Sequence, residues 1–139
     1  MSLEWSDRYK IGEEKTDEEH LEWFRLANTF LAAVDLKSKQ ETGEAFRRYT
    51  CQHFFNEEAM MHEMQFPYIA THVEEHERLV YTLNQILDVA GDDVLTKTEL
   101  DEFVGYCLTR HIIKFDAPLE IYLKQNGLMR DSMQHHIAA

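Results

Sequence analysis

The chain has 139 residues, a hydrophobic fraction of 44% and a formal net charge of −12. It is long enough for one domain with a buried core, and its negative charge argues against nucleic acid or an anionic membrane as a partner. Two cysteines make no disulfide framework, and no apolar stretch resembles a signal peptide or a membrane span, so we predict a single cytoplasmic domain over residues 1–139.

Helix start signals recur along the chain. A Ser or Thr followed three residues later by Glu is the pattern of a capping box, and it occurs at Thr16, Ser38 and Thr96. The segments FPY at 66–68 and AGDD at 90–93 read as turns. We therefore predict an N-terminal arm over 1–15, helices over about 17–37, 39–64, 68–90 and 97–116, and a short C-terminal helical segment within 118–139.

Residues at steps of three and four form one inward stripe on each predicted helix. The predicted inward positions are His20, Phe24, Ala27, Leu31 and Val34 in the first helix; Phe46, Tyr49, His53, Glu57, Met60 and Met64 in the second; Ile69, His72, His76, Leu79, Leu83 and Ile86 in the third; and Leu100, Val104, Cys107 and His111 in the fourth. Short connections favour antiparallel neighbours, so the predicted fold class is all-α, an up-down-up-down four-helix bundle.

This topology brings polar residues of all four stripes to one level of the bundle. They are His20, His53, Glu57, His72, His76 and His111. A single histidine on an apolar stripe is more often a core residue than a ligand, but five at one level with a carboxylate indicate a metal site. A buried ionised carboxylate is costly unless it is paired or bound to a metal.

The donor set narrows the choice of metal. Imidazoles with carboxylates suit iron, zinc or copper rather than magnesium or calcium. Five histidines exceed the three protein ligands of a usual catalytic zinc, so we predict two metal ions with bridging carboxylates.

Asp116 is the candidate for a second bridging carboxylate, five residues after His111. Five steps along an ideal α-helix rotate the chain by about 140°, which would turn the two side chains apart. Pro118 lacks the N–H that would bond to Lys114, so a widened turn is expected, and it would return Asp116 to the face of His111. In the alternative, Asp116 only caps the segment that starts at Pro118.

Four motifs resemble those of the hemerythrins, and most closely the single-domain bacterial members. They are DEEH ending at His20, HFFNEE from His53, HVEEH from His72 and HIIKFD from His111 to Asp116, and the likeness covers roughly residues 5–125. The resemblance implies two iron ions with an oxo or hydroxo bridge. It places His72, His76 and His111 on one iron, His20 and His53 on the other, and Glu57 and Asp116 between them.

The resemblance also implies the function. Dioxygen would bind reversibly at the open position of the second iron, in a carrier, store or sensor with no catalytic residues. The alternatives are a di-iron enzyme (peroxidase, oxidase or nitric-oxide handling) and an iron reservoir. Dioxygen is the expected partner, without nucleic acid or membrane, and the resemblance identifies no protein partner.

Some residues depart from the family pattern or fall outside it. Glu19 stands where Gln is frequent, which places a carboxylate beside the second iron, and Cys107 stands where bulkier residues occur, which predicts a more open pocket. His62 lies off the stripe and is expected on the surface, and His135 and His136 lie in a predicted frayed tail.

Overall fold

The computed structural model describes residue 10 and residues 14–88, 98–99, 101–103 and 105–127. The predicted turn at 90–93, the start signal at Thr96, the tail histidines and most of the N-terminal arm lie outside these residues, as does the side chain of Cys107.

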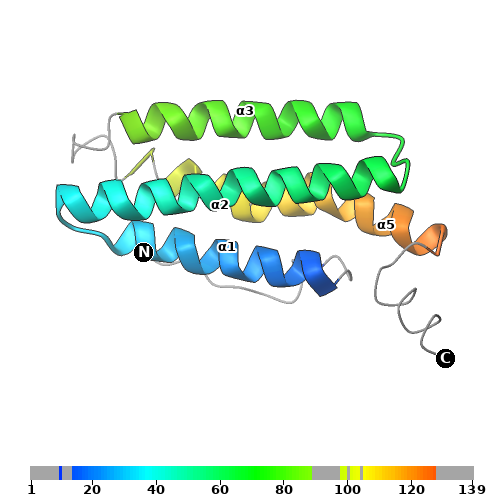
Figure 1. The fold of residues 1–139 in the computed structure, drawn as a ribbon, viewed down its shortest axis with the longest axis horizontal. Coiled ribbons are helices and arrows are strands. Elements are labelled where there is room, and N and C mark those ends of the chain that lie inside the picture. The colour runs from blue at the N-terminus through cyan, green and yellow to red at the C-terminus, as the bar shows by residue number, and fades with distance from the viewer. Residues whose placement is uncertain (1–9, 11–13, 89–97, 100, 104, 128–139) are drawn as a thin grey trace.

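Successive helices run in opposite directions, which confirms the predicted all-α, up-down-up-down bundle (Figure 1). The first three are α1 (Glu14–Ala32), α2 (Leu36–Glu63) and α3 (Ile69–Asp88). The fourth contains helical residues 98–99, 101–103 and 105, and continues through η2 (Tyr106–Asp116) into α5 (Ala117–Gln125). Within the described part of the chain, no helix has both the length and the apolar character needed to cross a membrane.

The connection between α1 and α2 differs from the prediction. α1 ends at Ala32, and Asp35 caps α2 by accepting hydrogen bonds from the Ser38 backbone N–H at 2.8 Å and from its hydroxyl at 2.9 Å. The predicted cap at Ser38 was wrong because Asp35 occupies the N-cap position and Ser38 lies in the first turn. Val34 falls in this connection and is 84% exposed, so its inward placement was also wrong.

The predicted turn between α2 and α3 is confirmed, and its hydrogen bonds explain its shape. The Phe66 N–H bonds to the Met61 carbonyl at 2.9 Å and the Gln65 N–H bonds to the His62 carbonyl at 3.2 Å, a Schellman arrangement. Gln65 takes the left-handed conformation with φ of 55°. The turn returns Phe66 to the core beside Met61 and starts α3 close to the end of α2.

Two apolar clusters fill the bundle core. The larger one contains Trp23, Phe24, Ala27, Phe30, Phe46, Phe54, Leu79, Leu83, Ile86, Phe103 and Ile112. The smaller one contains Met60, Met61, Phe66, Leu119 and Leu123. Along α2 and α3 the predicted polar positions fall between residues of the two clusters, so apolar side chains flank the candidate site on both sides.

Candidate metal centre

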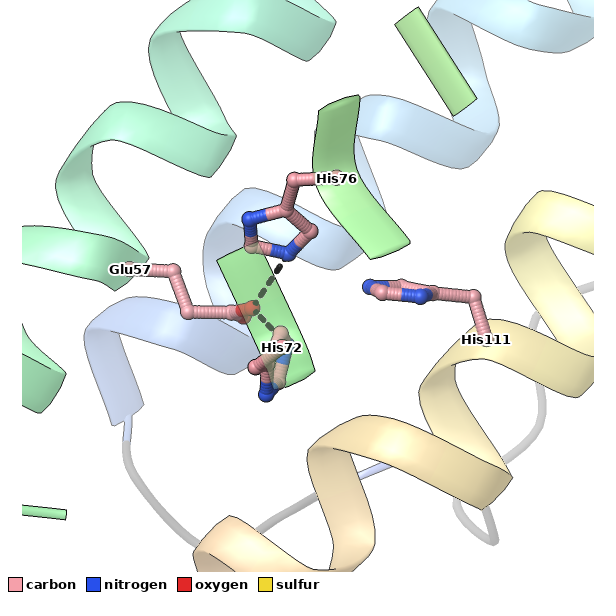
Figure 2. A group of neighbouring side chains, drawn as sticks. All are labelled: Glu57, His72, His76 and His111. Carbon is pink, nitrogen blue, oxygen red and sulfur yellow. Dashed lines mark ion pairs between the residues drawn. The ribbon is translucent and has the colours of Figure 1, made fainter. Parts of the chain in front are cut away.

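All seven predicted site residues lie at one level of the bundle, and none is more than 3% exposed. α1 provides His20, α2 provides His53 and Glu57, α3 provides His72 and His76, and η2 provides His111 and Asp116. Figure 2 shows Glu57, His72, His76 and His111 directed toward a common space between three helices.

Local helix geometry accounts for four of these placements. His53 and Glu57 are four residues apart on α2, and His72 and His76 are four apart on α3. Side chains at this spacing share one face of an α-helix. The stripe pattern therefore predicted correctly that both pairs face the interior.

The last pair depends on a departure from the α-helix. η2 is π-helical over Tyr106–Asp116, and at its end the Ala117 N–H bonds to the Ile112 carbonyl five residues back. This wider turn places Asp116 near His111, with 3.5 Å between Asp116 Oδ1 and His111 Nε2. The predicted widening is confirmed, and the capping alternative is wrong because Asp116 makes no side-chain capping hydrogen bond to α5.

Glu57 presents one oxygen to each of two histidine groups. Its Oε1 lies 2.8 Å from His72 Nε2 and 3.1 Å from His76 Nε2. Its Oε2 lies 3.8 Å from His20 Nε2 and 3.7 Å from His53 Nε2.

Asp116 divides its oxygens in the same way. Its Oδ1 lies 3.0 Å from His72 Nε2, and its Oδ2 lies 3.2 Å from His20 Nε2. Each carboxylate therefore spans the space between a three-histidine group (His72, His76 and His111) and a two-histidine group (His20 and His53).

The hydrogen bonding of these atoms tests whether a metal suits the site. The Nε2 atoms of all five histidines and the four oxygens of Glu57 and Asp116 are buried without a hydrogen-bond partner. Buried polar groups are normally paired, and buried charges are paired or coordinate a metal. Two sets of donor atoms are compact enough to hold a cation, each lying within 4.8 Å of one another: Glu57 with His72, His76 and His111, and Glu57 with His20 and His53. The donor atoms therefore fit metal ions.

The carboxylates remain ionised in this cluster. Burial raises the pKa of Glu57, but the neighbouring histidines His20, His72 and His76 outweigh burial and hold it well below its usual range. Burial and the charge of Glu57 raise the pKa of Asp116, but nearby histidines lower it overall.

The pKa values of the site histidines shift in opposite directions. Burial lowers the pKa of His20 and His72, but the two carboxylates outweigh it and raise each pKa to about 10. Burial dominates at His111 and lowers its pKa to about 4. A metal binds neutral imidazoles, so the protons that His20 and His72 retain through these raised pKa values would have to leave when a metal binds.

Two further carboxylates contact the outer ring nitrogens of site histidines. Glu19 Oε1 lies 3.0 Å from His53 Nδ1, and Glu58 Oε2 lies 2.7 Å from His76 Nδ1. The capping role predicted for Thr16 and Glu19 was wrong, because Thr16 lies inside α1 and the Glu19 side chain is directed to α2. Sequence spacing gave no sign of the Glu58 contact, because the contact joins two helices and depends on how they align.

Aromatic rings surround the imidazoles. Phe54 stacks on His76 with 3.8 Å between ring centroids, and Trp23 lies 5.3 Å from His53. Trp23 Nε1 donates to the Thr50 hydroxyl at 2.8 Å, which fixes the indole in the core. A surface groove of about 480 Å³ between α2 and α3 reaches Phe54 and His76. Trp23 and Phe54 were missing from the predicted stripes, which were narrower than the buried faces of the helices.

The remaining histidine prediction within the described residues is confirmed, since His62 is exposed.

Comparison with known proteins also indicates a cation-binding domain. The family model described as "Hemerythrin HHE cation binding domain" matches residues 12–117. A bacteriohemerythrin of Ralstonia nicotianae is 27% identical over 130 residues, which cover 90% of this chain and 91% of the relative. A bacteriohemerythrin of Stenotrophomonas maltophilia is 28% identical over 115 residues, which cover 79% of this chain and 74% of the relative.

Proposed function

Because the chain belongs to the hemerythrin HHE cation-binding domain family, we propose that its buried centre holds two iron ions and binds dioxygen reversibly. The protein would act as an oxygen carrier, store or sensor. The names of its bacteriohemerythrin relatives favour an oxygen-binding protein over an enzyme.

The observation that carries this proposal is the placement of the two carboxylates. Each has one oxygen beside the three-histidine group and the other beside the two-histidine group. This arrangement supports Glu57 and Asp116 as bridges between two metals. The three-histidine group would then hold one iron and the two-histidine group the other, with an oxo or hydroxo group as a third bridge.

The unequal histidine groups give the centre its chemistry. The two-histidine group offers one nitrogen fewer, so the metal that it would hold would be the one with room for dioxygen. Iron ions held by these residues would supply the redox chemistry, since ferrous iron can donate electrons to dioxygen. Apolar residues of the two core clusters flank this level of the bundle, which limits access of water and proton donors.

The ligand types also favour binding over oxidation chemistry. Ferritin-like di-iron proteins use a Glu-rich site with Glu-x-x-His pairs. The centre proposed here combines five neutral imidazoles with two carboxylates, and that smaller negative charge gives less stabilisation to high-valent iron.

Two measurements test the proposal. Metal analysis of protein produced with ample iron should find about two irons per protomer, and His111→Gln should lower this value while the exposed His62→Gln should not. In an oxygen electrode, the ferrous protein should take up one dioxygen per iron pair and then stop. Binding of one metal per protomer, or continued oxygen consumption with a reductant, would contradict reversible binding at a di-iron site.

A further inference from the structure

The outer ring nitrogen of His53, Nδ1, contacts a carboxylate of a different helix. Its Nδ1 lies 3.0 Å from Glu19 Oε1, while its Nε2 is buried and faces the cluster without a hydrogen-bond partner. An ionised carboxylate can only accept a hydrogen bond, so His53 Nδ1 must carry the proton. In the neutral ring the lone pair is then on Nε2, the atom directed toward the proposed iron.

Glu19 is itself fixed by two neighbours on α2. Asn56 Nδ2 donates to the same carboxylate oxygen at 3.3 Å, and Asn56 accepts from Gln52 Nε2 at 2.8 Å. The Tyr49 hydroxyl donates to the Glu19 backbone carbonyl at 3.1 Å. The Glu19 side chain is only 16% exposed. Its position is therefore set by a network between α1 and α2, unlike that of a freely moving surface acid.

A carboxylate contacts the Nδ1 atom of one histidine in each group. In the three-histidine group, His76 Nδ1 contacts Glu58 at 2.7 Å, whereas His111 Nδ1 is buried without a partner. In the two-histidine group, His20 Nδ1 also lacks a partner. Each group thus has one histidine whose Nδ1 contacts a carboxylate and one whose Nδ1 is buried without a hydrogen-bond partner. Glu19 directly precedes His20 in sequence, so one short segment of α1 provides a ligand and orients the second ligand of the same group.

We propose that Glu19 is a positioning residue for the two-histidine iron: it fixes the His53 ring with Nε2 toward the metal and places negative charge behind that ligand. This inference rests on the proposed di-iron centre. Carboxylates in this position orient a ligating histidine and increase its basicity. The added charge favours the ferric over the ferrous ion on the side where dioxygen is proposed to bind.

Three variants separate orientation from charge. Glu19→Gln keeps a hydrogen-bond acceptor but removes the charge, and Glu19→Ala removes both. Glu18→Gln removes a charge from the adjacent exposed position and serves as the control. Circular dichroism first establishes that each variant is folded, and Glu19→Gln preserves the test if Glu19→Ala is not.

The measurements are iron affinity in competition with a chelator and the midpoint potential of the iron-loaded protein. We expect Glu19→Ala to lose about 10–100-fold in iron affinity, whereas Glu19→Gln should keep its iron. Both should shift the potential in the positive direction, since a tenfold loss of ferric preference corresponds to about 59 mV for one electron. Glu18→Gln should change neither quantity.

Two results would overturn the inference alone: Glu19→Ala with wild-type iron affinity and potential, or Glu18→Gln with the same shift as Glu19→Gln. Wild-type protein that takes up no iron would overturn both the inference and the proposed function.

Discussion

Asp116 has no exposed surface, and its two oxygens lie beside histidines of α1 and α3. As a bridge it would serve both irons, so Asp116→Ala should bring the iron content well below two per protomer. Asp88→Ala removes an exposed acid at the end of α3 and should change the free energy of unfolding by no more than about 0.5 kcal/mol. Metal analysis of both purified variants measures the iron content, and urea unfolding checks the stability of the Asp88→Ala control.

An Asp116→Ala variant that retains both irons would show that this carboxylate is not a shared ligand. The π-helical turn that presents it would then need another explanation.

Phe54 and Phe55 are neighbours with opposite environments. Phe54 is 2% exposed and stacks on His76, whereas Phe55 is 68% exposed. Phe54→Ala should lower the free energy of unfolding by about 3–5 kcal/mol because it leaves a cavity beside the centre. Phe55→Ala should stay within about 0.5 kcal/mol of the wild type. Urea unfolding of the metal-loaded proteins checks both values, and equal losses would contradict the described packing.

Gly43 on α2 lies close to side chains of two other helices. A Cβ added there would lie 2.7 Å from Leu87 Cδ2 and 3.0 Å from Phe30 Cε1. Gly43→Ala gains about 0.5–1 kcal/mol of helix propensity, but crowding in a packed core typically costs about 1–3 kcal/mol. We expect a net loss of stability in urea unfolding.

Ala45 provides the control for Gly43, because it is exposed on the same helix. Ala45→Gly should lose only the propensity difference, about 1 kcal/mol. A Gly43→Ala protein more stable than the wild type would mean that the Leu87 and Phe30 side chains move aside at little cost.

Some features of the helices could be predicted from the sequence, and others could not. The α2 and α3 pairs were predictable because spacing by four fixes a shared helix face. The widened turn before Pro118 was also predictable, since proline removes a donor. The 11-residue extent of η2 was not, because Pro118 alone gives no reason for widening that begins at Tyr106.

Contacts between helices were the main features that the sequence pattern missed. The carboxylates of Glu19 and Glu58 reach histidines of other helices, and only the relative register of the helices brings them together. The cap of α2 was missed for a local reason: Asp35 and Ser38 are both good capping residues, and the spacing rule selected the wrong one.

For the whole molecule, the proposed centre makes stability depend on metal and pH. Without metal, His20 and His72 have pKa values raised to about 10 from 6.5. A raised pKa means that the folded state binds the proton more tightly, so the contribution is complete below pH 6.5 and is lost as pH rises through about 10. Glu57 and Asp116 have lowered pKa values, and their contribution is lost only in acid.

The metal-free protein should therefore become less stable between pH 6.5 and about pH 10, with its urea midpoint falling steadily. Below pH 6.5 the lowered pKa of His111 opposes stability, so the range above 6.5 gives the clearest test. Metal-loaded protein should have a higher midpoint and a weaker pH dependence, because neutral imidazoles bind the metal. A metal-free protein that gains stability as pH rises over this range would contradict these assignments.

Reversible dioxygen binding at the proposed di-iron centre is tested most directly by the visible absorption spectrum. The ferrous protein should be nearly colourless and should develop a charge-transfer band in air. The band should fade when oxygen is removed and return when oxygen is readmitted, over repeated cycles. A band that never reverses, even after rapid mixing, and whose decay a reducing substrate accelerates with turnover, would contradict the account and identify an enzyme.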